Sequence, residues 1–134
     1  METKICSKCK IEKPIEDFAF RDKQKGTRRA ECKQCISERQ KKKYHDRKDL
    51  LNDYKSKHPC VKCGESRFYT LDFHHIDPTT KIGTVARLAV ESSGQRMWEE
   101  VDKCVILCAN CHREFHYLNE LQGITLKQYC NLEP

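Results

Sequence analysis

The sequence has few apolar residues and no long hydrophobic run. Of its 134 residues, only 37% are hydrophobic, whereas 34% are charged. A large continuous core is therefore not expected, and small domains of this kind usually need cross-links. No stretch is long and apolar enough to span a membrane, and residues 1–5 lack the apolar segment of a secretory signal. We therefore expect a cytoplasmic, reducing location and no membrane partner.

Acidic residues are scarce in the first half of the chain. Residues 1–58 hold 18 Lys and Arg against 10 Asp and Glu, whereas residues 59–134 hold 8 against 10. The basic half is the expected contact for a polyanion such as DNA, and a solvated, highly charged helix is the alternative.

Cysteines, by contrast, are abundant and regularly spaced. Eight of the 10 fall in four C-x-x-C pairs, and two such turns complete one tetrahedral metal site. In a reducing compartment this pattern favours zinc over disulfides. We expect two structural zinc ions, one bound by Cys6, Cys9, Cys32 and Cys35, the other by Cys60, Cys63, Cys108 and Cys111. Cys104 and Cys130 are expected to be packing thiols, with a role as spare zinc ligands as the alternative.

The cysteine pairs divide the chain into three segments. Residues 1–35 form a first zinc unit, in which Phe18 and Phe20 are expected to pack beside the metal and Gly26 to form a hairpin or loop tip. Residues 36–57 contain no Gly or Pro and are rich in helix formers, which predicts a basic linker helix ending before Pro59. Residues 58–134 form the second zinc unit.

Several cations in the first two segments are candidates for tracking a phosphate backbone. Their alternative role is to keep a linker helix soluble. The candidates are Arg28, Arg29, Arg39, Lys41, Lys42, Lys43, Arg47 and Lys48.

The second zinc unit predicts two strands and a helix. Residues 68–73 alternate and are rich in aromatics, and residues 105–107 form a short apolar run, so both are expected to be strands. A helix is expected from Asn110, as its N-cap, to a stop at Gly123. Two short helices are expected between the strands, one after Thr84 and one around residues 95–102, and a last helical turn over residues 125–130.

Four histidines occupy two places in this unit. His112 and His116 are four residues apart, so they share a helix face and can hold one metal ion. His74 and His75 are adjacent at a strand end, so one can ligate that metal while the other faces elsewhere. A set of three histidines leaves coordination positions open for water and phosphate, whereas a set of four cysteines is closed and structural.

The stretch LDFHHID, followed by VILCANCHREFH, resembles the HNH endonucleases, and most closely their zinc-bound branch in phages and bacteria. The resemblance covers roughly residues 58–117. It implies an α+β fold with a small zinc-stapled ββα-metal core, the nuclease domain then being residues 58–134. Residues 1–35 are similar to the zinc-ribbon-like modules that precede such domains.

The resemblance also implies roles for individual residues. His75 is the general base, and His74, His112 and His116 hold a catalytic divalent metal, which is Mg²⁺, Mn²⁺, Ni²⁺, Co²⁺ or Zn²⁺. The family's middle asparagine is replaced here by Lys103. Asn110 is expected to orient the site or cap the helix, and a backbone carbonyl is the alternative partner for His75. Arg113 is a candidate clamp for a neighbouring phosphate.

We therefore expect a metal-dependent HNH endonuclease that hydrolyses phosphodiester bonds of double-stranded DNA, with a phage or homing role in a bacterial host. The first alternative is a non-catalytic double-zinc module that binds nucleic acid, and the second is a zinc-dependent scaffold for protein partners. The chain is expected to act as a monomer or a dimer. One active site cuts one strand, so cleavage of both strands requires a dimer or two successive events.

Overall fold

The computed structural model describes residues 1–91 and 93–132, so the last two residues of the predicted nuclease domain lie outside the described part. Helices and small antiparallel sheets make up the chain, which confirms the α+β class. The chain divides into two compact units, Met1–His45 and Asp46–Pro134. Within the described residues, no helix combines the length and the hydrophobicity that a membrane crossing requires.

The first unit is built from two small hairpins around a cysteine cluster. Its strands are β1 (Thr3–Ile5), β2 (Glu12–Pro14), β3 (Phe20–Asp22) and β4 (Thr27–Arg28), with a 3-10 turn, η1 (Ile15–Asp17), between β2 and β3. Gly26 lies in the turn between β3 and β4 at φ +66°, as its predicted place at a tip requires. Cys6, Phe18 and Cys32 are fully buried in one cluster, whereas Phe20 is 41% exposed and lies outside it, so the expected packing of Phe20 beside the metal was wrong.

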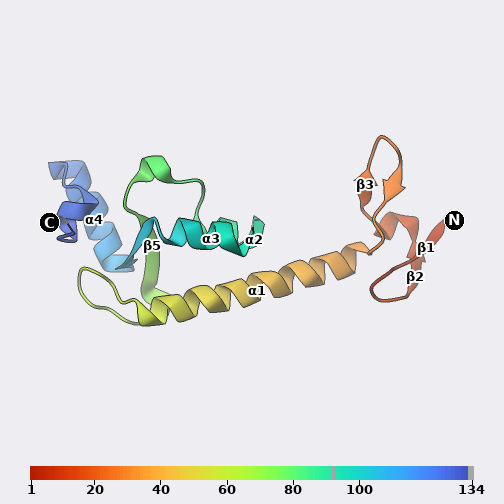
Figure 1. Ribbon diagram of the computed structural model, residues 1–134, viewed down its shortest axis with the longest axis horizontal. Helices are drawn as coiled ribbons and strands as arrows, with labels where there is room; N and C mark the ends of the chain where they lie inside the picture. Colours follow the sequence, from red (N-terminus) through yellow and green to blue (C-terminus); the bar gives the residue numbers. More distant parts are fainter. Residues whose placement is uncertain (92, 133–134) are drawn as a thin grey trace. The chain divides into compact units, whose positions relative to one another are not determined.

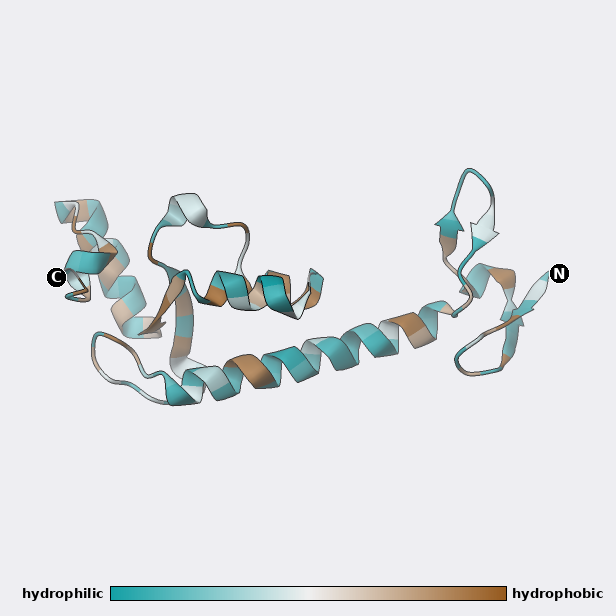
Figure 2. Ribbon diagram, viewed as in Figure 1, coloured by the Kyte–Doolittle hydropathy of each residue, from teal (hydrophilic) through white to brown (hydrophobic). Residues whose placement is uncertain are grey.

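One long helix, α1 (Lys33–Lys57), follows the first unit's hairpins. It begins three residues earlier than predicted because the second cysteine pair forms its first turn, with the Ile36 amide donating to the Cys32 carbonyl at 3.1 Å. It ends before Pro59, as expected. Hydrophilic residues cover most of its length (Figure 2). Its only buried residue is Leu51, which belongs to the second unit.

The second unit contains the predicted pair of strands and the predicted helices. After α1 come η2 (Phe68–Thr70), β5 (Leu71–His75), η3 (Pro78–Thr80), α2 (Val85–Glu91), α3 (Gly94–Val101), β6 (Cys104–Cys108), α4 (Ala109–Gln122) and α5 (Leu126–Tyr129). The first strand begins at Leu71 rather than at residue 68, because residues 68–70 form a 3-10 turn. The stop of α4 at Gly123, with φ +67°, is confirmed.

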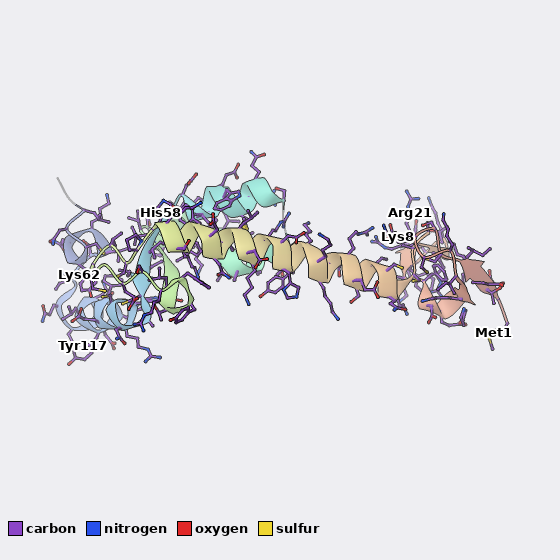
Figure 3. The ribbon with its side chains drawn as sticks, turned by 90° about the horizontal axis from the view of Figure 1, so that it is seen from below. Met1, Lys8, Arg21, His58, Lys62 and Tyr117 are labelled. Carbon is purple, nitrogen blue, oxygen red and sulfur yellow. The ribbon has the colours of Figure 1, made fainter. Side chains whose placement is uncertain are left out.

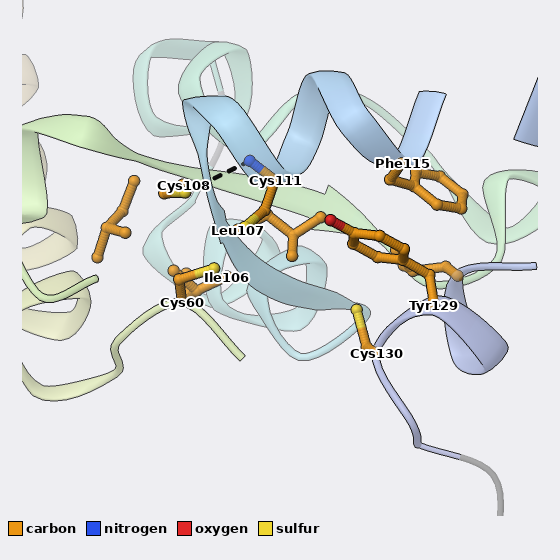
Figure 4. Packing of buried hydrophobic residues seen from close by; sticks show 10 residues of the cluster. Cys60, Ile106, Leu107, Cys108, Cys111, Phe115, Tyr129 and Cys130 are labelled. Carbon is orange, nitrogen blue, oxygen red and sulfur yellow. Dashed lines mark hydrogen bonds between the residues drawn. The ribbon is translucent and has the colours of Figure 1, made fainter. Parts of the chain in front are cut away.

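The strands β5 and β6 pair antiparallel, with Leu71 opposite Cys108 and His75 opposite Cys104. The helices α4 and α3 lie on opposite sides of β5 (Figure 1). A core around Leu107 and Phe115 forms under α4 and α5 (Figure 4), and a second one around Met97 forms between α2, α3 and the last turns of α1. The β5–β6 pair is thus packed against helices on both sides.

The beginning of α4 differs from the prediction. Its N-cap is Cys108, whose Sγ accepts a hydrogen bond from the Cys111 amide at 3.4 Å (Figure 4). Asn110 is the second residue of the helix and is exposed, so its predicted capping role was wrong. A residue inside the first helical turn has helical backbone angles and cannot cap that turn.

Candidate metal centres and active site

Both predicted cysteine tetrads are assembled in the fold. In each, the four sulfur atoms lie within 4.8 Å of one another. A tetrahedral zinc with Zn–S bonds of about 2.3 Å requires sulfur atoms roughly 3.8 Å apart. The Cys6 and Cys35 sulfurs are 3.9 Å apart, and those of Cys63 and Cys108 are 3.6 Å apart. Two cysteine clusters suited to structural zinc are therefore confirmed.

Backbone amides favour the thiolate form of one cysteine in each tetrad. Burial raises the pKa of Cys6, but hydrogen bonds from amides that include those of Cys32 and Lys8 outweigh it and lower the pKa to about 6. The same balance lowers the pKa of Cys60 to about 7. Zinc binds thiolates, so these bonds prepare each tetrad for metal.

The two remaining cysteines lie outside the tetrads. Cys130 is buried in the core beside Tyr129 (Figure 4), and the thiol of Cys104 donates to the Glu100 carbonyl at 3.3 Å. Among the described residues, neither belongs to a group of side chains that could hold a metal ion. These surroundings are compatible with the expected role as packing thiols.

The histidines from β5 and α4 form a third cluster. His74, His112 and His116 each offer a ring nitrogen within 4.8 Å of the others, and their ring centroids are 4.8–5.1 Å apart. The pairing of Leu71 with Cys108 places the beginning of β5 beside the start of α4, and α4 then packs against β5, where its histidines meet His74. One helix face and one strand residue are thus brought together, as the spacing predicted.

Hydrogen bonds orient two of these rings. The Nδ1 atom of His74 lies 2.9 Å from the His75 carbonyl oxygen, and the Nδ1 atom of His112 lies 3.2 Å from Oδ2 of Asp72. Both partners are acceptors, so Nδ1 carries the proton and the Nε2 lone pair is left for a metal. Burial, with the neighbouring histidines, lowers the pKa of His74 and keeps its ring neutral, as a ligand requires.

A cavity of about 630 Å³ opens over this cluster. Besides the three histidines, it is lined by His75, by Pro78, Lys81 and Thr84 of the loop after β5, and by apolar residues that include Phe73 and Phe115. It therefore brings the ring nitrogens of the histidine cluster, a fourth histidine and a cation to one surface.

His75 turns its ring toward α3 rather than toward the other histidines. Its Nε2 atom lies 2.6 Å from Oε1 of Glu100, whose side chain is 1% exposed. Burial raises the pKa of that carboxyl, but hydrogen bonds from Lys103, His75 and the Ile82 amide outweigh it and lower the pKa to about 2. The partner of Nε2 is thus this carboxylate rather than the backbone carbonyl that the sequence suggested as an alternative.

Sequence reasoning missed Glu100 altogether. A usable signal was present, because Met97, Glu100 and Val101 share one helix face and the other two residues are apolar. A carboxylate on an apolar face is buried only when it has partners. Lys103 is one of them.

The predicted DNA contacts fall into two groups. Arg28 donates to the Phe18 carbonyl at 2.9 Å, Arg39, although exposed, pairs with Glu31 at 2.6 Å, and Arg47 donates to the Ala89 carbonyl at 2.9 Å, so each of these three already has a partner within the chain. The remaining candidates are exposed: Arg29, Lys41, Lys42, Lys43, Lys48 and Arg113. Side chains project all along α1 (Figure 3).

Comparison with curated proteins finds a similarity to the type IV methyl-directed restriction enzyme EcoKMcrA of Escherichia coli (strain K12). The two are 31% identical over 84 residues, which cover 58% of this chain and 25% of that enzyme. The chain thus matches about a quarter of the length of that relative. No family model matches the chain. No solved structure matches it either.

Proposed function

We propose that this chain is a metal-dependent DNA endonuclease of the HNH type, with β5, β6 and α4 as its ββα-metal core. The observation that carries the proposal is the cluster of His74, His112 and His116 beside a fourth histidine, His75, held by a buried carboxylate. The similarity to a restriction enzyme points to the same class of reaction and to DNA as substrate.

The segments take different parts in this proposal. Residues 1–35 form a zinc module that, with the linker helix of residues 36–57, contacts the DNA backbone, and residues 58–134 form the nuclease domain. The exposed cations Arg29, Lys41, Lys42, Lys43 and Lys48 bind phosphates, with Arg113 beside the site. Arg28, Arg39 and Arg47 are left out, because the fold already uses them.

The donor chemistry of the three histidines fits a divalent metal. The three imidazoles, two of them with Nδ1 bonded to acceptors, each offer a ring nitrogen to one group and leave coordination positions open. An ion bound there would polarise the scissile phosphate and stabilise the charge that develops on the leaving 3′ oxygen.

His75 performs the proton transfer. With Nε2 bonded to Glu100, its Nδ1 is free to accept a proton from a water molecule. That water forms a bond to phosphorus while the bond from phosphorus to the 3′ oxygen breaks. The products are a 5′ phosphate and, once protonated, a 3′ hydroxyl. Lys81 lines the same cavity and would neutralise a non-bridging phosphate oxygen.

Plasmid cleavage tests this function. Purified protein with its cysteine-bound zinc is incubated with supercoiled plasmid and Mg²⁺, Mn²⁺, Ni²⁺ or Co²⁺, and with EDTA as the metal-free control. We expect nicking or linearisation that depends on added metal, and a loss of at least about a hundredfold in rate for His75→Ala.

A matched control is His45→Ala, because His45 is an exposed histidine in the first unit. It should cleave as the unchanged protein does. Cleavage of no DNA by a folded protein with two zinc ions per chain would refute the nuclease proposal. Salt-sensitive DNA binding in that case would support the non-catalytic double-zinc module instead.

A further inference from the structure

The surroundings of His75 suggest how the proposed general base is held. We propose that Glu100 is the positioning residue for His75: it fixes the ring with Nε2–H toward α3, so that Nδ1 faces the cavity as the base. This inference rests on the proposed function and deepens it. It assigns to a buried helix glutamate the orienting task for which the sequence suggested Asn110 or a backbone carbonyl.

The hydrogen-bond geometry fixes which nitrogen carries the proton. Oε1 of Glu100 accepts from the Ile82 amide at 3.0 Å, and Oε2 accepts from Nζ of Lys103 at 3.0 Å. A carboxylate with two donors on it is ionised and can only accept from a third group. The His75 Nε2 atom at 2.6 Å must therefore be that third donor, so in the neutral ring that acts as a base the lone pair lies on Nδ1.

The same carboxylate connects three elements around the cavity. It belongs to α3, holds a ring on β5 and binds the loop between η3 and α2 through the Ile82 amide. Lys103 extends this network, because its Nζ also donates to the Thr80 carbonyl at 3.0 Å. That loop contributes Lys81 and Thr84 to the cavity wall. Glu100 thus fixes the base and the adjoining wall together.

Burial makes the arrangement rigid. The side chain of Glu100 is 1% exposed and that of His75 is 9% exposed. Water cannot readily replace either partner, so the ring has one orientation rather than several. An exposed carboxylate would leave the ring free to rotate, and a base that rotates is out of line for part of the time.

The alternative role for Glu100 is purely structural: it would only connect α3 to the loop between η3 and α2. The two roles predict different kinetics. A structural residue affects folding and DNA affinity, whereas a positioning residue lowers the rate of the cleavage step through His75 alone.

The test is single-turnover plasmid cleavage by Glu100→Ala, Glu100→Gln and the matched control Glu99→Gln. Glu99 is the neighbouring, exposed carboxylate on α3. For Glu100→Ala we expect a cleavage rate lowered about tenfold to a hundredfold with DNA affinity unchanged. Glutamine keeps an oxygen that accepts from His75, so Glu100→Gln should recover most of the rate. The control should match the unchanged protein.

Combining Glu100→Ala with His75→Ala separates the two roles further. Because Glu100 acts through His75, the double variant should cleave no more slowly than His75→Ala alone. A further tenfold loss would overturn the proposal, and so would a normal rate for Glu100→Ala.

A measurement on the unchanged protein covers the case in which Glu100→Ala does not fold. Long-range ¹H–¹⁵N NMR spectra of His75 should show a protonated Nε2 and an unprotonated Nδ1. The opposite tautomer would overturn the positioning role even if metal-dependent cleavage and its loss in His75→Ala stand. Failure of the nuclease proposal itself would instead appear as absent cleavage by the unchanged protein.

Discussion

At the scale of single residues, the partners of the ring nitrogens decide what each histidine can do. His74 and His112 have Nδ1 bonded to an oxygen, which leaves Nε2 for a metal. His75 has Nε2 bonded to a carboxylate, which leaves Nδ1 for proton transfer. In the proposed function, three rings of identical chemistry are thus divided between two tasks by their acceptors.

Asp72 provides a test of this division. Its Oδ2 is the acceptor for Nδ1 of His112, and its side chain is 52% exposed. We expect Asp72→Asn to weaken Mn²⁺ or Ni²⁺ binding at the histidine cluster by about tenfold, the lower end of the usual range for such partners, because of that exposure. Isothermal titration calorimetry measures it, with Asp102→Asn, an exposed acid at the end of α3, as control. Equal affinities for the two variants would show that Asp72 does not orient His112.

The residues that make up the three clusters could be predicted from the sequence, whereas their hydrogen-bond partners could not. C-x-x-C pairs and an i, i+4 histidine pair are local patterns, so spacing alone indicates which residues share a site. Glu100 and His75 are 25 residues apart, and Asp72 and His112 are 40 apart. Nothing local in the sequence specifies which carboxylate such a histidine meets, because the fold brings them together.

At the scale of elements, the start of α4 depends on the second tetrad. Cys108 is the last residue of β6, the N-cap of α4 and one of the four cysteines of the second tetrad, and Cys111 lies in the first turn of the helix. His112 follows directly. The junction between β6 and α4 therefore supplies two cysteines of the tetrad and also determines the direction in which the histidines of α4 point. The sequence pointed to Asn110 rather than Cys108 as the N-cap because sulfur is not among the usual capping groups.

Substituting one cysteine in each tetrad should show which tetrad the histidine cluster depends on. Cys63→Ser should release one zinc and abolish Mn²⁺ binding at the histidine cluster, because α4 is no longer fixed. Cys9→Ser should also release one zinc but leave Mn²⁺ binding unchanged, since that tetrad belongs to the first unit. Zinc content by mass spectrometry and Mn²⁺ titration measure both. Equal loss of Mn²⁺ binding in the two variants would contradict this assignment.

At the scale of the whole molecule, charge and proposed chemistry belong to different units. The first unit, residues 1–45, holds 14 Lys and Arg against 7 Asp and Glu. The second unit carries the histidine cluster and has 12 Lys and Arg against 13 Asp and Glu. Attraction to DNA should therefore depend chiefly on the first unit, and cleavage on the second.

The salt dependence of DNA binding tests this separation. We expect Lys41→Gln with Lys43→Gln to weaken binding and to reduce the slope of log affinity against log salt by roughly 0.9 for each phosphate that the protein no longer neutralises. The control is Lys57→Gln with Arg67→Gln, which removes two charges already paired with Asp53 and Glu65 in the second unit. Fluorescence anisotropy measures the slopes. A larger change in the control would place the phosphate-binding cations in the second unit.

The strand pairing between β5 and β6 also has a consequence for the order of events during synthesis. His74 and His75 leave the ribosome well before β6, and β5 has no partner strand until Cys104–Cys108 has followed. The two histidines of α4 come later still, and their helix begins at a sulfur that also belongs to the second tetrad. A nascent chain therefore cannot gather the four rings early. Any activity of the site arises late, after the strands have paired and the tetrad has closed.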